Sequence, residues 1–244
     1  MTEPLIQFRN VHKAFGEKVV YRGLFLEIHK GEVLTIVGGS GVGKSVMLKM
    51  LIGLLKPDRG TIKFEGNEVT VMGEEQLSKV RQRIAMLFQA GALFDSISVE
   101  ENVAYGLEEH FRYKMSKKEI ADRVEWALGL VGLPGIQQMW PADLSGGMRK
   151  RVALARTMIL KPEIMLYDEP TTGLDPVTSR EINDLILKVQ QIYKTSSIII
   201  SHDMSSVFQT SNRIAVLIDG RCSAEGNYDQ LTRNTDPAVQ GFFQ

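Results

Sequence analysis

Residues 38–45 read GGSGVGKS and directly follow the apolar run VLTIV at 33–37. Glycine is costly inside regular structure, so a cluster of it marks a sharp bend or a close approach to a ligand. Gly38, Gly43, Lys44 and Ser45 satisfy the pattern G-x-x-x-x-G-K-[ST], and a helix-like apolar pattern follows them. A loop of this kind predicts polyphosphate binding, because successive main-chain N–H groups and the helix dipole meet the negative charge.

Two side chains of this loop have distinct expected roles. Lys44 would reach the β- and γ-phosphates of a nucleotide, and the Ser45 hydroxyl would bind Mg²⁺. The alternative, a glycine-rich turn with a surface lysine, is disfavoured by the strand and helix on either side. The expected phosphate-binding residues are Gly38, Gly39, Ser40, Gly41, Val42, Gly43, Lys44, Ser45 and Val46.

The remaining apolar runs predict an α/β fold. Short, partly alternating segments indicate an antiparallel sheet, and continuous apolar runs are typical of parallel strands buried on both faces. Residues 90–160 hold several helical segments and no convincing strand, so they are expected to form an inserted helical lobe. The antiparallel strands are expected at 5–8, 19–28 and 61–64, the parallel strands at 33–37, 83–88, 163–168, 197–201 and 214–218, and the helices at 44–54, 116–131, 146–160 and 177–193.

Composition limits the possible functions of the chain. Its 244 residues hold 29 Lys plus Arg and 29 Asp plus Glu, so no net charge indicates nucleic acid or an anionic membrane. The single cysteine, Cys222, excludes a disulfide framework and favours a reducing compartment. The N-terminus lacks the pattern of a secretory signal, and no run of about 18 apolar residues occurs. The expected location is cytoplasmic, and work on a membrane would require another subunit.

A second chemical motif is IMLYDE at 164–169, a buried strand that ends in two carboxylates. Mg²⁺ prefers hard oxygen ligands, so Asp168 is expected to bind the metal. Side chains alternate along a strand, so Glu169 points elsewhere and is expected to orient and deprotonate a water molecule. A solvated pair of acids at a strand end is the alternative, and the phosphate loop makes it the weaker reading.

A third motif, LSGGM at 144–148, opens a predicted helix. Ser145 can cap this helix, while Gly146 and Gly147 leave its first N–H groups uncovered, which predicts a second anion site. With this motif the chain resembles the ATP-binding cassette (ABC) ATPases of transporters over essentially its whole length. In that family two chains pack head to tail, and the signature motif of one chain completes the nucleotide site of the other.

The resemblance assigns roles to four further residues. Phe15 matches the aromatic residue that stacks on adenine, although a core phenylalanine is the alternative. Gln89 matches the glutamine that links Mg²⁺ and the attacking water to the helical lobe. Asp175 matches the aspartate at the dimer seam and can also cap the helix that begins at Pro176. His202 matches the switch histidine that contacts the γ-phosphate, and it follows a buried strand, where α/β sheets place ligands.

The family resemblance implies a P-loop NTPase (RecA-like) core with an antiparallel β-subdomain and an inserted helical subdomain that carries the signature. The core is expected at 1–89 and 161–244, and the helical subdomain at 90–160. The implied cofactors are ATP and Mg²⁺, and the implied partners are a second copy of the chain and an integral membrane permease. The implied catalytic residues are Gln89, Glu169 and His202.

Three stretches indicate a subfamily. LSGGM has Met148 where the family usually has glutamine, and it occurs with FQAGALFDSISVEENVAYGL at 88–107 and DPAVQGFF at 236–243. Together they resemble the ATPase subunits of lipid transporters that work with MCE-domain proteins, the Mla type of Gram-negative envelopes. This implies phospholipid transport, an MCE-domain partner, a small cytoplasmic regulatory subunit, and a peripheral location on the cytoplasmic face of the inner membrane.

Several alternatives stay open beside this reading. An importer of amino acid, metal or another small solute would carry the same cassette motifs. A soluble ABC ATPase without a permease tends to have two cassettes or a long coiled coil, and a nucleotide sensor would be expected to lack Glu169 or His202. The basic run Arg149, Lys150 and Arg151, followed by Arg156, is expected to be a solvated helix face with local phosphate attraction, not a nucleic-acid site.

Overall fold

The computed structural model describes residues 3–111 and 114–243. Its central sheet has the strand order β10-β9-β3-β8-β7-β6. All neighbouring strands in it are parallel except β9 and β10, which are antiparallel. The strands are β3 (Val33–Gly38), β6 (Ile84–Leu87), β7 (Ile164–Asp168), β8 (Ser196–Ile200), β9 (Arg213–Ile218) and β10 (Arg221–Gly226).

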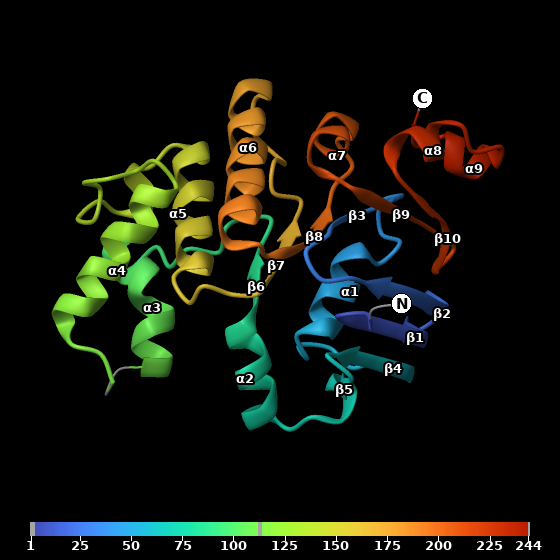
Figure 1. The fold of residues 1–244 in the computed structure, drawn as a ribbon, viewed down its shortest axis with the longest axis horizontal. Helices are drawn as coiled ribbons and strands as arrows, with labels where there is room; N and C mark the ends of the chain where they lie inside the picture. The colour runs from blue at the N-terminus through green and yellow to red at the C-terminus, as the bar shows by residue number, and fades with distance from the viewer. Residues whose placement is uncertain (1–2, 112–113, 244) are drawn as a thin grey trace.

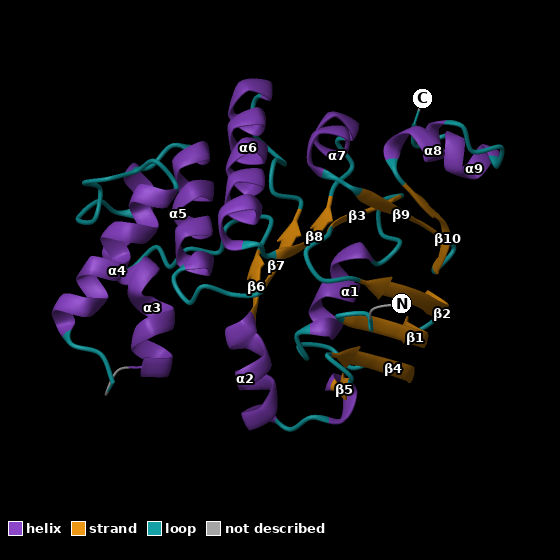
Figure 2. Cartoon of the chain, in the orientation of Figure 1, coloured by secondary structure: helices purple, strands orange, loops and turns teal. Residues whose placement is uncertain are grey.

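A second sheet is antiparallel and has the order β2-β1-β4-β5. Figure 2 shows its strands in a separate layer beside α1. The inward-facing residues of β1 and β2 join one apolar core with α1, which explains why this sheet lies under the phosphate loop. Its strands are β1 (Ile6–Phe15), β2 (Lys18–Ile28), β4 (Arg59–Phe64) and β5 (Asn67–Glu68).

Helices cover both faces of the central sheet. In Figure 1, α1 and α2 lie below it, and α6 and α7 lie above it. The short helices α8 and α9 pack beside β9 and close a third small core around Val37 and Val239. The bounds are α1 (Lys44–Leu51), a 3-10 turn at Val69–Val71, α2 (Glu74–Arg83), α6 (Pro176–Tyr193), α7 (Met204–Thr210), α8 (Tyr228–Thr232) and α9 (Pro237–Gln240).

Between β6 and β7 the regular elements of the described residues are all helical. They gather at the left of Figure 1, at the end of the molecule opposite the antiparallel sheet. Ser116 and Glu119 form a capping box at the start of α4, which satisfies two N–H groups that the helix cannot pair itself. These helices are α3 (Val99–Phe111), α4 (Lys117–Leu130), a 3-10 turn at Pro141–Asp143, and α5 (Gly146–Met158). The boundaries 90 and 160 of this lobe stay predictions.

The structure corrects parts of the expected secondary structure. The central sheet is not wholly parallel, because β10 pairs with β9 as an antiparallel edge strand. β10 has no apolar run, since its residues alternate between exposed and half-buried positions. The first helix ends at Leu51 and not at Leu54, because Gly53 adopts a φ of 70°. Along the part of the chain that is described, every helix is too short or too polar to cross a bilayer.

Candidate nucleotide and metal site

The glycine-rich stretch is a loop between β3 and α1. Gly43 caps α1 with a φ of 105°, and a Cβ at this position would lie 2.2 Å from Val20 Cγ1, so only glycine fits. The Lys44 ammonium donates to the carbonyl oxygens of Gly38 at 2.8 Å and Gly39 at 3.1 Å. Lys44 is 9% exposed, so the loop encloses its own lysine at the base of the cleft.

Tyr21 on β2 supports the same loop from the antiparallel sheet. Its side chain is fully buried, and its hydroxyl donates to the carbonyl oxygen of Gly43 at 2.5 Å. Burial raises the pKa of this phenol, so the hydroxyl stays a donor throughout the physiological range. Sequence reasoning missed Tyr21, because a tyrosine in an alternating strand has no pattern that separates it from an ordinary core residue.

Ser45 and Asp168 meet across the base of the cleft. Ser45 lies in the first turn of α1 and Asp168 at the end of β7, and the Ser45 hydroxyl donates to Asp168 Oδ1 at 2.8 Å. Asp168 is 7% exposed. Burial raises the pKa of Asp168 above its usual value, and the hydrogen bond from Ser45 opposes this shift.

These two oxygen donors fit Mg²⁺. A hydroxyl and a carboxylate within hydrogen-bonding distance match the hard oxygen ligands that this ion prefers. Asp168 forms no salt bridge within residues 3–111 and 114–243, so its buried carboxylate has no direct cationic partner there. The environment therefore favours a bound cation beside Ser45 and Asp168.

Glu169 directly follows Asp168 and pairs with His202. Glu169 has a φ of 52°, in the left-handed region that is rare for residues other than glycine. His202 Nδ1 donates to Glu169 Oε2 at 2.5 Å, and the Thr172 hydroxyl donates to the same oxygen at 3.0 Å. The strained backbone and these two donors hold the carboxylate in one orientation, which is typical of functional sites.

Lys150 connects Gln89 to α5, the helix that begins with the signature motif. Lys150 on α5 is 7% exposed, and its ammonium donates to the main-chain oxygen of Gln89. Burial lowers the pKa of Lys150, while the charges of Asp168 and Glu169 oppose the shift. The expectation that 149–151 is a solvated helix face is wrong at Lys150, because this position of α5 packs against the segment after β6.

One cleft of about 880 Å³ gathers most of the predicted phosphate-binding and catalytic residues. Phe15 is 46% exposed at its edge, which leaves an aromatic face available. Two residues predicted for this half of the site do not line the cleft: Val42 packs against the apolar core, and Asp168 is buried beside Ser45. The predicted residues that line the cleft are Phe15, Gly38, Gly39, Ser40, Gly41, Gly43, Lys44, Ser45, Val46, Gln89, Glu169 and His202.

The signature residues lie in a different pocket of about 420 Å³. Ser145, Gly146, Gly147 and Asp175 line it, and none of them lines the cleft of the phosphate loop. The Ser145 hydroxyl accepts from the N–H of Met148 at 3.2 Å. Asp175 caps α6, accepting from the N–H of Thr178 at 3.0 Å. One copy of the chain thus holds two separate halves of the predicted site.

The family follows from a match to known sequences. A family model described as ABC transporter matches residues 21–172, which include the phosphate loop, the signature and both carboxylates. The chain belongs to the ABC transporter family. Within that family it is an ATPase cassette, and its P-loop core, antiparallel sheet and helical subdomain confirm the expected fold class.

Relatives with curated names cover nearly the whole chain. Protein TRIGALACTOSYLDIACYLGLYCEROL 3, chloroplastic, of Arabidopsis thaliana is 39% identical over 99% of this chain and 74% of that protein. The Intermembrane phospholipid transport system ATP-binding protein MlaF of Haemophilus influenzae is 37% identical over 100% of this chain and 92% of its own length. A Mycobacterium leprae protein named "Probable ribonucleotide transport ATP-binding protein mkl" is 37% identical, over 97% of this chain and 68% of that protein.

A solved structure agrees with the cassette fold. The dimeric structure of an ATP-binding cassette in a post-hydrolysis state, bound to ADP and Pi, matches with a TM-score of 0.83. It shares 31% identity and covers 91% of this chain and 98% of its own chain. The order of strands and helices seen here is therefore the order of a cassette that has been observed as a dimer.

Asp168→Asn should separate fold stability from metal binding. Burial raises the pKa of Asp168, so the folded state binds more protons, and folding stability falls as pH rises through the window above the usual aspartate pKa. The asparagine variant should unfold at the same or a higher temperature than the parent at neutral pH, yet lose Mg²⁺-dependent ATP hydrolysis. Thermal unfolding and phosphate release measure the two effects. A large loss of apo stability, beyond that of the exposed control Asp122→Asn, would contradict this account.

Tyr21→Phe should weaken ATP binding more than turnover. The change removes one hydroxyl and leaves the Gly43 carbonyl without its side-chain donor. We expect the Kd for ATP to rise about three- to tenfold, the range of one buried hydrogen bond, with the turnover of saturated enzyme nearly unchanged. Fluorescent-nucleotide titration gives the Kd, and Tyr105→Phe on the exposed face of α3 is the control. An unchanged Kd would remove Tyr21 from the support of the loop.

Proposed function

We propose that the chain is the ATP-hydrolysing subunit of a phospholipid transporter in a Gram-negative envelope, acting through a separate membrane permease. The observation that carries this proposal is similarity over 98–100% of the chain to ATP-binding proteins named for intermembrane phospholipid transport. The cleft and the signature pocket supply the parts that ATP hydrolysis needs. The permease would supply the lipid pathway.

The site is complete only when two copies face each other. The cleft of one copy and the signature pocket of the other would enclose one nucleotide, with Ser145 and Gly147 of the partner subunit at the γ-phosphate. Lys44 and the loop N–H groups hold the phosphates, and Phe15 contacts the adenine ring. Ser45, Asp168 and Gln89 would hold Mg²⁺, which neutralises phosphate charge when bound. The dimeric cassette related to this chain supports the arrangement.

Hydrolysis requires Glu169 and His202 to act on one water molecule. Glu169 accepts a proton from the water as its oxygen attacks the γ-phosphorus, and the bond to the ADP oxygen breaks. His202 holds the carboxylate through Oε2 and leaves Oε1 for the water. The exposed imidazole of His202 lines the cleft and would also contact the γ-phosphate. The remaining contribution is positioning and electrostatic stabilisation.

The helical lobe would transmit hydrolysis to the permease. Lys150 joins α5, which carries the signature, to the main chain at Gln89, which lines the cleft. A change at the γ-phosphate can therefore move the lobe as well as the loop at Gln89. We propose an MCE-domain protein and a small cytoplasmic regulatory subunit as further partners, with the chain peripheral on the cytoplasmic face of the inner membrane.

Import of a small solute is the second candidate function. The mycobacterial relative named for ribonucleotide transport is as similar as the phospholipid-transport relative from Haemophilus, at 37% identity. The cassette motifs are common to both kinds of transporter, so they do not identify the transported molecule. The permease and its external partner therefore distinguish the two functions.

Glu169→Gln should trap the ATP-bound dimer. Glutamine keeps an oxygen that can accept from His202 but cannot take the proton of the attacking water. We expect turnover to fall about 10²- to 10⁴-fold while ATP still binds, as for loss of a general base. Phosphate release measures turnover, and size-exclusion chromatography with ATP measures the dimer. Retained hydrolysis would remove Glu169 from the role of base.

The transported substrate can be identified from the purified complex. The chain should be isolated with its membrane partners from its native host, and co-purified molecules identified by mass spectrometry. The proposal predicts phospholipid and an MCE-domain protein in the wild-type complex. A complex of Lys44→Ala is the matched control for lipid held without ATP. Recovery of a solute-binding protein without an MCE-domain protein would overturn the lipid assignment.

A further inference from the structure

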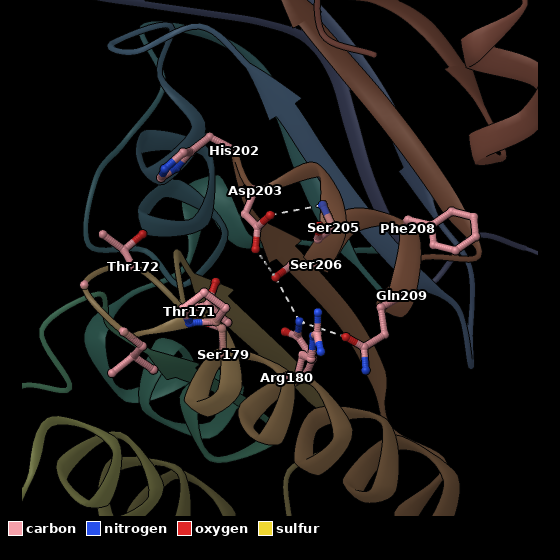
Figure 3. Close-up of a pocket in the computed structure, with 14 residues that line it drawn as sticks. Thr171, Thr172, Ser179, Arg180, His202, Asp203, Ser205, Ser206, Phe208 and Gln209 are labelled. Carbon is pink, nitrogen blue, oxygen red and sulfur yellow. Dashed lines mark hydrogen bonds between the residues drawn. The ribbon is translucent and has the colours of Figure 1, made fainter. Parts of the chain in front are cut away.

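A hydrogen-bond network through Asn183, Ser206 and Asp203 connects two helices beside the catalytic cleft. It lies in a pocket of about 670 Å³ between α6 and α7, next to His202 (Figure 3). Asn183 on α6 is 3% exposed and Ser206 on α7 is 4% exposed. Neither residue has a role in the nucleotide site described above, and Asn183 is the polar member of a face of α6 that otherwise buries apolar side chains.

In this network each side chain donates a hydrogen bond to the next, from Asn183 to Ser206 and from Ser206 to Asp203. The Asn183 amide donates to Ser206 Oγ at 2.8 Å, and the Ser206 hydroxyl donates to Asp203 Oδ2 at 2.6 Å. The same amide donates to Gln209 Oε1 at 3.2 Å, and Gln209 Nε2 donates to Asp184 Oδ1 at 2.7 Å. Ser206 thus uses its hydroxyl both as acceptor and as donor, so a change at Asn183 reaches Asp203.

Asp203 holds the turn that carries His202. Its other carboxylate oxygen accepts from the N–H of Ser205 at 3.0 Å, and its own N–H donates to Ser201 Oγ at 3.1 Å. Figure 3 shows Asp203 directed toward Ser206 while the His202 ring points to the other side of the turn. The imidazole is 66% exposed, so apolar packing does not fix it. Its direction depends on the turn and on its bond to Glu169.

The network also includes a residue of α6, the helix that begins at the signature pocket. Asn183 lies on α6, and α6 starts at the capping residue Asp175, which lines that pocket. A buried amide without its partner costs more than the hydrogen bond is worth, so α6 and α7 must keep this pair together as they move. Displacement of α6 at the signature pocket is therefore passed to the turn at His202.

We propose that Asn183 is a positioning residue for hydrolysis: through Ser206 and Asp203 it fixes the direction of His202 toward Glu169 and couples it to α6. The inference rests on the role proposed for His202 at the γ-phosphate. Asn183 would thus connect the interface between two copies to Glu169 and His202 without contacting the nucleotide itself.

The test compares two variants that remove different hydrogen bonds of the network. Asn183→Asp keeps the shape of the side chain but replaces the donating amide by an acceptor, and Ser206→Ala removes the middle hydroxyl. In the full-length protein each should lower kcat for ATP about tenfold, the effect of one buried hydrogen bond, with KM unchanged within about twofold. The kcat of the double variant should be little lower than that of either single variant, because both substitutions disrupt the same hydrogen-bond network.

Thr210→Val is the matched control. Thr210 is 5% exposed on the same helix, and its hydroxyl donates to the main-chain oxygen of Ser206. This variant should keep both kcat and KM, with a thermal midpoint similar to those of the other two variants. An equal fall in kcat for Thr210→Val, additive effects in the double variant, or a kcat retained by both folded single variants would each overturn the link.

His202→Ala in the same assay separates this inference from the site on which it rests. Loss of hydrolysis in His202→Ala together with unchanged Asn183 and Ser206 variants would overturn the link alone. Retained hydrolysis in His202→Ala would contradict the role of the histidine itself. Loss of turnover in all three, with KM preserved in the Asn183 and Ser206 variants, is the result that the proposed link predicts.

Discussion

A buried carboxylate at the end of β7 constrains the rest of this structure. Asp168 is removed from solvent, its pKa is raised by burial, and its bond within the cleft comes from Ser45. That bond fixes the first turn of α1 against the central sheet, so the phosphate loop, Lys44 and the N–H groups of the loop take their places relative to β7. A cation beside this pair relieves the cost of the buried charge. In the proposed function, metal and phosphate would therefore occupy this site together.

The second constraint is that the phosphate loop and the signature motif of one copy lie in separate pockets. The cleft of the phosphate loop and the pocket of the signature share no lining residue within the described chain, although both are needed for the proposed chemistry. Two contacts still connect the halves inside one copy: Lys150 to the main chain of Gln89, and Asn183 through Ser206 to Asp203. Nucleotide-dependent docking of a second copy can therefore act on the lobe and on the catalytic turn together.

Sequence predicted the parts of the site that depend on local backbone geometry. GGSGVGKS, the strand end at Asp168 and the cap at Ser145 each specify a loop or helix terminus within a few residues, and the structure places them accordingly. Tyr21, Lys150 and Asn183 were not predicted, because their partners are 22, 61 and 23 residues away in the chain. β10 was also missed, since its edge position needs no apolar run. Tertiary contacts of this kind leave no local pattern.

The central claim, that one nucleotide site is shared by two copies, can be tested by complementation. Lys44→Ala removes the phosphate contact of one half-site, and Ser145→Arg blocks the other half-site, so each variant alone should be inactive. Co-assembled in one complex, the two variants pair an intact loop with an intact signature at one of the two sites. The account predicts ATP hydrolysis well above the sum of the separate variants. Mixed complexes, verified by differential tagging, that remain as inactive as either variant would contradict a shared site.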